Sequence, residues 1–361
     1  MKQWTVRASM TATMLAAVGA LGACGGGGDN RMQVKSVTVF GDSLSDVGTY
    51  HAATGDPANP GKFTVNPGKV WAENVAAQYG LTVTPNRSLT LDKDASSGAT
   101  TATGTATVIG GNGYAEGGAR VAMLPSESGI GNNQLVAPVR AQVNRYLQTH
   151  DRFADDELVL ISGGGNDIYA QFSAVCWHTD DNGLGAGNTT IDIATAKIAE
   201  AAQAEVDMLR QIRSKGARLI VLISQGNPIV SPFWRYYGSP DYQAKGCYTP
   251  VPAAQTDAWR VLFNKIVQDG IANMPEVVYV DAQAAWGKVQ ADPVGYGFTN
   301  LTDKACTNTK LTTSATFCTR ATMAAPDADQ TYFWSDSFHP TPHGHKILSD
   351  QVLAQLKSVA R

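Results

Sequence analysis

Four short runs of β-branched and aliphatic residues, set between long segments with helical spacing, most constrain the fold of this chain. The runs are Val37–Phe40, Leu158–Ser162, Leu219–Ile223 and Val277–Val280. Apolar residues recur at helical spacing in Lys69–Tyr79, Leu135–Leu147, Asp192–Ser214, Gln255–Asn273 and His343–Val359. Short apolar strands that alternate with helices are typical of a parallel sheet covered on both faces. The sequence therefore predicts an α/β fold with three layers, α/β/α, around a mainly parallel central sheet.

Two segments do not follow this alternation and are expected to be insertions over one end of the sheet. Residues 85–113 are rich in Thr, Ser and Gly, and residues 289–331 hold two of the cysteines. They are either surface loops or the walls of a substrate cleft, because loops on a rigid scaffold often carry function. With 43% of its residues hydrophobic, the chain can bury a large core, and residues 35–361 are expected to form one domain.

The N-terminus has the features of an export signal. Lys2 and Arg7 provide a positively charged start. They precede an uncharged stretch that begins at Ala8 and ends in Leu21-Gly22-Ala23-Cys24. The stretch is shorter than the roughly 20 apolar residues that a spanning helix needs, so residues 1–24 are predicted to be a signal peptide. The last four residues resemble a bacterial lipobox, which predicts a lipid anchor on Cys24 and a glycine-rich tether over residues 25–34. The alternative is a soluble export signal with a chance cysteine near its cleavage site.

Both interpretations of the N-terminus predict an exported protein, either a lipoprotein of the bacterial cell envelope or a secreted protein. Besides Cys24, the chain has four cysteines, an even number that is typical of disulfides in an oxidising compartment. Three pairings are possible. We prefer Cys306–Cys318, because it closes a short loop rich in Thr and Asn, together with Cys176–Cys247. No cysteine or histidine has the spacing of zinc ligands, so no structural zinc site is expected.

Three short motifs carry side chains suited to catalysis. Gly41-Asp42-Ser43-Leu44 follows the first predicted strand, Gly164-Gly165-Asn166-Asp167 follows the second, and Asp336-Ser337-Phe338-His339-Pro340 precedes the last helix. In an open parallel sheet, ligands bind outside the carboxyl ends of the strands, so the first two motifs are expected at the mouth of a cleft. In the third, the carboxylate can accept from histidine Nδ1 and leave Nε2 free. Each motif alone is also ordinary turn or helix-cap chemistry.

Together with Gly117-Gly118, these motifs, in this order, resemble the four sequence blocks of the GDSL, or SGNH, hydrolase family. The resemblance implies a flavodoxin-like hydrolase fold and a serine carboxylic-ester hydrolase that needs no cofactor. It implies Ser43 as the nucleophile, His339 as the general base and Asp336 as the group that orients the imidazole. The implied oxyanion donors are the Ser43 N–H, the Asn166 amide and the Gly118 N–H, with Gly117 as the alternative to Gly118.

The expected substrates are small-molecule or lipid esters, because the chain looks most like bacterial secreted esterases, lysophospholipases and related acyltransferases. Four residues that follow a predicted strand either line an acyl pocket or belong to a packed core or disulfide-supported loop near Cys247: Phe233, Trp234, Tyr236 and Tyr237. The formal net charge of −3 provides no electrostatic footprint for nucleic acid.

Two other classes of protein compete with this interpretation. A two-metal phosphoesterase is suggested by Gly41-Asp42, Gly165-Asn166-Asp167 and His343-Gly344-His345. Such a site also needs an Asp-x-His motif on the first strand and a histidine directly after the asparagine, and the sequence has neither.

The other alternative is a non-catalytic envelope lipoprotein on a hydrolase scaffold. Retention of Ser, Asn, Asp and His together argues against it.

Overall fold

The computed structural model describes residues 33–93, 100–124, 135–177, 189–227, 230–307 and 314–359. These residues belong to the unit that begins at Met32. The predicted signal peptide, Cys24 and most of the predicted tether lie outside the described residues. Among the described residues, no helix is both long enough and apolar enough to cross a bilayer.

A four-stranded parallel sheet with the order β1-β4-β5-β6 forms the centre of the described unit. Its strands coincide with the four predicted runs to within one residue: β1 (Ser36–Phe40), β4 (Glu157–Ser162), β5 (Leu219–Ile223) and β6 (Val277–Val280). The register places Val39, Leu160, Val221 and Val278 in one row across the sheet. The α/β fold predicted from the sequence is therefore confirmed.

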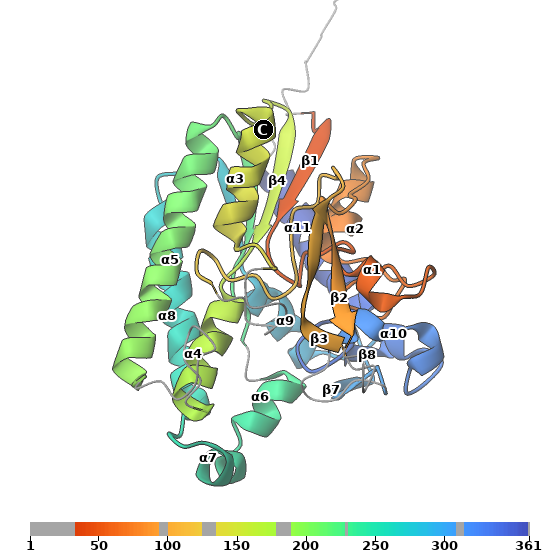
Figure 1. Cartoon of the computed structure of the whole chain (residues 1–361), viewed down its shortest axis with the longest axis vertical. Helices are drawn as coiled ribbons and strands as arrows, with labels where there is room; N and C mark the ends of the chain where they lie inside the picture. The colour runs from red at the N-terminus through yellow and green to blue at the C-terminus, as the bar shows by residue number, and fades with distance from the viewer. Residues whose placement is uncertain are drawn as a thin grey trace, which may run out of the picture. The chain divides into compact units, whose positions relative to one another are not determined.

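Helices cover both faces of this sheet, because neighbouring residues along each strand point to opposite apolar layers. The row that contains Val39 packs with α2 (Trp71–Gln78), α9 (Ala282–Ala291) and α11 (Pro342–Val359). The opposite row, which includes Ile161 and Leu222, packs with α3 (Val139–His150), α4 (Gly165–Trp177), α5 (Ile191–Ser214) and α8 (Ala253–Ile271). Figure 1 shows α5 and α8 on one side of the strands, with α2 and α11 on the other.

Local sequence explains why the longest helix has its observed ends. The Thr190 side chain caps α5 by accepting a hydrogen bond from the Ile193 N–H. Asp192 in the first turn and Arg213 in the last turn both complement the helix dipole. The chain leaves the helix at Gly216, which has a φ of 100° that favours glycine.

Smaller elements complete the described structure. A separate antiparallel pair is formed by β2 (Arg87–Lys93) and β3 (Thr100–Val108), and a short parallel pair by β7 (Asn300–Lys304) and β8 (Tyr332–Trp334). The first of the two predicted insertions is thus largely a hairpin, and the second contains a strand and short helical turns. The remaining helices are α1 (His51–Thr54), α6 (Pro232–Tyr237), α7 (Pro240–Gly246), α10 (Ala328–Thr331) and the 3-10 turns Ala315–Phe317 and Arg320–Thr322.

Two disulfides connect parts of the described structure, and they have the pairing preferred from the sequence. Cys176 at the end of α4 is bonded to Cys247, which follows α7. Cys306, which follows β7, is bonded to Cys318, which follows the first 3-10 turn. Disulfides are typical of proteins that fold in an oxidising compartment.

Candidate active site

Ser43 lies in a tight turn directly after β1, where the chain leaves the sheet. Gly41 makes this turn possible, because a Cβ atom at this position would lie 2.6 Å from the Ser162 Oγ atom. Gln142 of α3 fixes the same glycine by donating to its carbonyl oxygen at 2.8 Å and accepting from its N–H at 2.9 Å. Ser43 is partly exposed although Asp42 is buried. The turn therefore presents the Ser43 hydroxyl at the carboxyl edge of the sheet.

A buried polar network supports the turn from below. The Asp42 carboxylate accepts hydrogen bonds from the Leu44 N–H and the Ser162 hydroxyl, each at 3.1 Å. Ser162 is also 2.8 Å from the Ser45 hydroxyl, which accepts from the Trp71 indole N–H. Burial raises the pKa of the Asp42 carboxyl, although these two hydrogen bonds and the nearby His339 oppose the shift. The network joins the carboxyl ends of β1 and β4.

Ser43, His339 and Asp336 form a continuous hydrogen-bonded chain. The His339 Nε2 atom lies 2.8 Å from the Ser43 Oγ atom. The His339 Nδ1 atom lies 2.9 and 2.7 Å from the two Asp336 carboxylate oxygens. A carboxylate can only accept, so Nδ1 carries the proton and Nε2 faces the serine as an acceptor. This arrangement can remove the proton of the serine hydroxyl.

The Asp336 carboxylate is completely buried and accepts several backbone hydrogen bonds. Its Oδ1 atom accepts from the N–H groups of Phe338 and His339, both at 2.8 Å. Its Oδ2 atom accepts from the Ala315 N–H. Burial alone raises the pKa of the Asp336 carboxyl. The charge and hydrogen bond of His339, together with the Phe338 and His339 N–H groups, outweigh burial and lower the pKa below its ordinary value. The carboxylate thus stays ionised beside the imidazole.

The glycine motif, Gly117-Gly118, is fixed by hydrogen bonds to both the N–H and the carbonyl of Gly117. The Gly117 N–H donates to the Asp46 carboxylate at 2.9 Å, and the Gly117 carbonyl accepts from the Tyr50 hydroxyl at 2.7 Å. The Phe63 ring, whose centroid is 5.1 Å from that of His339, fills the space beside Gly117. Gly118 follows with a φ of 86°, which favours glycine. The Gly117 N–H is therefore already committed to Asp46.

The asparagine motif begins α4 and is tied to the glycine motif. The Asn166 side-chain amide donates to the Ala119 carbonyl at 2.9 Å, and a primary amide has a second N–H to offer. The next residue, Asp167, accepts from the Val121 N–H at 2.9 Å and pairs with Arg120 at 3.3 Å. Burial raises the pKa of Asp167, while Arg120 opposes this shift. The motifs that are far apart in the sequence therefore meet at one edge of the sheet.

The histidines proposed for a two-metal site do not lie together with its other groups. His343 stacks on Phe298, with ring centroids 4.6 Å apart. His345 is buried and accepts from the Trp71 N–H at 3.3 Å. Within the described parts of the chain, no group of three or more His, Cys, Asp or Glu side chains is placed to hold a metal ion.

The aromatic residues expected near Cys247 include two that belong to a packed core. Phe233 and Trp234 are buried, and the Phe233 ring stacks on Phe338 with centroids 4.4 Å apart. Tyr236 is 49% exposed. The core interpretation thus holds for Phe233 and Trp234, and the contact of Phe233 with Phe338 supports the turn that carries His339.

Several residues that support the site were not assigned a role from the sequence. Gln142 had a usable signal, because it is a polar residue on the buried stripe of a helix that also contains Val139 and Val143. Asp46 lies two residues after the serine motif, but nothing in its spacing indicates a contact with Gly117. The Ala315 N–H is a backbone donor, which no side-chain pattern can indicate.

The protein thus has an α/β fold in which a serine, a histidine and an aspartate are joined by hydrogen bonds at the carboxyl edge of the parallel sheet. A family model described as GDSL-like Lipase/Acylhydrolase matches residues 37–352. The match extends over most of the chain, so the chain belongs to the GDSL-like lipase and acylhydrolase family. It includes the serine, glycine, asparagine and histidine motifs.

Two curated relatives match over shorter segments. The chain is 34% identical to Lipase 1 of Photorhabdus luminescens over 85 residues, which are 24% of this chain and 13% of that protein. It is 36% identical to the GDSL esterase/lipase EXL2 of Arabidopsis thaliana over 74 residues, which are 20% of this chain and 19% of that protein. The matches thus span a small part of each relative's length.

Two solved structures match over a larger share of the chain. The first is LAE5, an alpha/beta hydrolase enzyme from the metagenome of Lake Arreo, with 11% identity and a TM-score of 0.40, covering 91% of this chain and 98% of that chain. The second is a protein from Lactobacillus plantarum, with 14% identity and a TM-score of 0.37, covering 90% of this chain and 98% of that chain. TM-scores this low do not establish a common fold.

Proposed function

We propose that this protein hydrolyses carboxylic esters, with Ser43 as the nucleophile. The observation that carries the proposal is the 2.8 Å contact between the Ser43 Oγ atom and the His339 Nε2 atom, with Asp336 bonded to the other ring nitrogen. The same order of groups activates a serine in hydrolases of unrelated folds. Membership of the acylhydrolase family supports the same reaction.

In the proposed reaction, the Ser43 oxygen attacks the ester carbonyl as His339 takes its proton. His339 then gives that proton to the departing alcohol, which leaves an acyl group on Ser43. A water molecule, deprotonated by the same imidazole, attacks the acyl carbonyl. The imidazolium then returns that proton to the Ser43 oxygen as the acid is released. Asp336 holds the Nδ1–H tautomer and stabilises the imidazolium formed in each step.

The proposed oxyanion donors are the Ser43 N–H, the Gly118 N–H and the second N–H of the Asn166 amide. The Asn166 contact with the Ala119 carbonyl supports this role, because it fixes the amide with its nitrogen toward the glycine motif. Fixed donors of this kind each lower the barrier by about 2.7–4 kcal/mol.

We propose that the protein acts outside the cytoplasm and is anchored to the bacterial envelope by a lipid on Cys24. The two disulfides support export, since such bonds persist in oxidising compartments. Labelling with radioactive palmitate in cells tests the anchor. Label is expected on the wild-type protein and not on the Cys24→Ala variant, and an unlabelled wild type would contradict the proposal.

Turnover of short p-nitrophenyl esters tests the catalytic proposal. Wild type is expected to be active, and Ser43→Ala is expected to lose activity with an unchanged circular dichroism spectrum. A Ser43→Ala variant that keeps most of the rate would refute the assignment. A panel of lysophospholipid, acetylated sugar and p-nitrophenyl esters of rising chain length would then identify the substrate class.

A further inference from the structure

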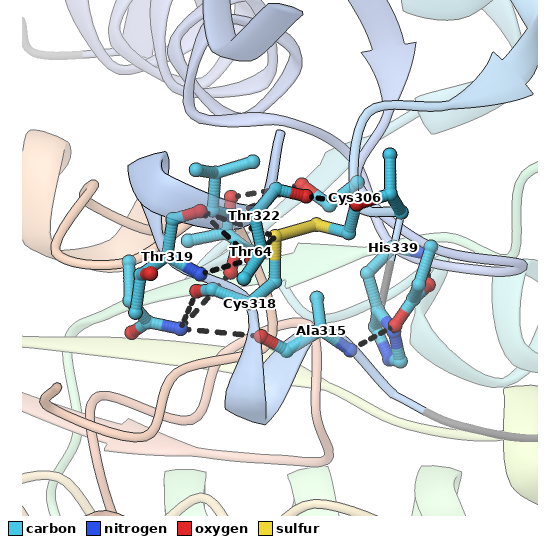
Figure 2. Close-up of a disulfide and its surroundings, with 12 residues drawn as sticks. Thr64, Cys306, Ala315, Cys318, Thr319, Thr322 and His339 are labelled. Atoms are coloured by element: carbon cyan, nitrogen blue, oxygen red, sulfur yellow. Dashed lines mark hydrogen bonds and ion pairs between the residues drawn. A yellow bond between two sulfur atoms is a disulfide. The ribbon is translucent and has the colours of Figure 1, made fainter. Parts of the chain in front are cut away.

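The disulfide Cys306–Cys318 lies close to Asp336, and the two segments that it joins both contact the stretch that carries this residue. The Cys306 N–H donates to the Ser335 carbonyl at 3.0 Å. On the other side, the Ala315 N–H, three residues before Cys318, donates to the Asp336 Oδ2 atom at 2.5 Å. Figure 2 shows the bond from Ala315 reaching the carboxylate beside His339. Cys306, Ala315 and Cys318 are all completely buried.

The segment from Ala315 to Cys318 is also held by contacts with Asn59 and Asn66. Asn66 donates its backbone N–H to the Cys318 carbonyl at 2.9 Å and its side-chain amide to the Ala315 carbonyl at 3.2 Å. Asn59 donates its amide to the Thr316 carbonyl at 3.0 Å. The disulfide and these amides therefore leave the Ala315 N–H little freedom to move away from Asp336.

The bond from Ala315 differs from the other backbone bonds to Asp336. The N–H groups of Phe338 and His339 belong to the same tight turn and bind Oδ1. The Ala315 N–H comes from a separate segment and binds Oδ2, the oxygen that also lies 2.7 Å from the His339 Nδ1 atom. It is thus placed to fix the carboxylate rotation on which the imidazole orientation depends.

We propose that the Cys306–Cys318 disulfide and the Ala315 N–H act as positioning groups for Asp336, so that full catalysis depends on this disulfide and not on Cys176–Cys247. The inference rests on the proposed function, because it assigns a role to groups that act through the triad. The second disulfide serves as a matched control. It connects the end of α4 with the segment after α7, where the Tyr248 N–H donates to the Cys176 carbonyl.

The first experiment compares the double variants Cys306→Ser/Cys318→Ser and Cys176→Ser/Cys247→Ser at a temperature well below the unfolding transition of both. The first is expected to lose roughly 10-fold or more in kcat with little change in KM, the size of a lost hydrogen bond to a charged group. Its Ser43 should react with an organophosphate more slowly by a similar factor. The control pair should keep most of its kcat. Equal losses in both variants, or an unchanged kcat in the first, would overturn the proposal.

A second pair of variants tests the N–H itself and decides the matter if the disulfide variants fail to fold. Ala315 begins a 3-10 turn, and the preceding Ser314 is extended, with φ −79° and ψ 162°. Proline is compatible with the first position of a helical turn and with an extended residue before it, and it lacks an N–H. Ala315→Pro should therefore lower kcat roughly 10-fold, while Ala315→Gly, which keeps the N–H, should stay near wild type. Equal rates in the two variants would contradict the proposal.

A third comparison separates action through Asp336 from general loosening of the site. In an Asp336→Ala background, adding Ala315→Pro should cause no further loss of kcat, because the acceptor of the N–H is already gone. A further full loss would contradict the positioning role. Failure of the proposed function would be distinct, since the wild type would then show no turnover or Ser43→Ala would remain active.

Discussion

The carboxylate of Asp46 and the backbone N–H of Gly117 are joined by a hydrogen bond of 2.9 Å, which connects the nucleophile turn to the glycine motif. The other oxygen of the same carboxylate accepts from the Gly48 and Thr49 N–H groups at 2.9 and 2.8 Å. Asp46 is completely buried. Burial raises the pKa of the Asp46 carboxyl to about 6, although the three N–H groups oppose this shift.

Replacing Asp46 with Asn should lower kcat roughly 10-fold, by displacing the glycine motif. The Asn oxygen can still accept from Gly48 and Thr49, but its NH₂ group then faces the Gly117 N–H, and two donors repel each other. Steady-state kinetics with a p-nitrophenyl ester measure the effect. The control is Asp56→Asn, an exposed residue that accepts from the Ala58 N–H. Equal kcat in the two variants would rule out a role for the Asp46–Gly117 contact.

The raised pKa of Asp46 also predicts how stability depends on pH. Folded Asp46 keeps its proton up to about pH 6, whereas the unfolded chain releases it near the ordinary carboxyl pKa of 3.8. Between these values the folded state binds more protons, so this residue lowers stability as pH rises, by on the order of 2–3 kcal/mol in total. Urea unfolding across this range should show the decline in wild type and a weaker one in Asp46→Asn. If the free energy of unfolding depends on pH in the same way in both proteins, the pKa of Asp46 is not raised.

Gly117→Ala should destabilise the protein and reduce activity. A Cβ atom at this position would lie 2.0 Å from the Phe63 ring, which packs against His339. Overpacking of this kind costs about 1–3 kcal/mol, and displacement of the ring also disturbs the imidazole. Thermal unfolding and kcat measure the two effects. Gly287→Ala is the control, because nothing lies within 4 Å of a Cβ there and the residue is within a helix. It should be neutral or stabilising by up to about 1 kcal/mol.

The sequence predicted the sheet well because its signal is local. Each strand is a short apolar run, and nearly every residue of β1, β4 and β5 is buried, so composition alone marks the ends of these strands. It missed α4 because the helix begins inside the glycine motif at Gly165, where the sequence favours a turn. It also missed α9, although Asp281 caps that helix by accepting from the Ala284 N–H. The pairing of β2 with β3 was hidden by the Thr- and Gly-rich composition of this part of the sequence.

The candidate site likewise has residues that local sequence motifs predict and residues that only the tertiary fold brings together. Ser43, Asn166, Asp336 and His339 were predicted because their side chains occur in short motifs next to strand ends or the last helix. Their supporting partners were not, since Asp46 reaches Gly117 and Ala315 reaches Asp336 only through the tertiary fold. The choice between Gly117 and Gly118 likewise depends on which N–H is already bonded, and sequence spacing does not contain that information. The catalytic roles themselves stay predictions.

Asn166→Ala should lower kcat by about 10²- to 10³-fold with little change in KM, because an oxyanion donor acts mainly in the transition state. Reaction of Ser43 with an organophosphate measures the same donor by an independent route. Asn273→Ala, an exposed asparagine after α8, is the control and should retain wild-type kinetics. A rise in KM with unchanged kcat would instead assign Asn166 to ground-state binding of the substrate.

Glu205→Gln should remove a pH dependence of stability that does not involve catalysis. Glu205 of α5 is buried, and its Oε1 atom has no hydrogen-bond partner among the described residues. Burial raises the pKa of the Glu205 carboxyl well above 4.5, and the negative charges of Asp167 and Asp42 raise it further. The folded state therefore holds this proton after the unfolded state has lost it. Wild-type stability should fall as pH rises above 4.5, until the pH passes the raised pKa.

The glutamine variant is neutral and has nearly the same shape, so its free energy of unfolding should decline less over the same pH range. Chemical denaturation at several pH values between about 5 and 9 measures the difference between the two proteins. Glu200→Gln, on the exposed side of the same helix, is the matched control and should follow the wild-type curve. If wild type and Glu205→Gln differ by a constant amount at every pH, Glu205 is not held protonated in the folded protein, and its buried oxygen must then be stabilised in its ionised form.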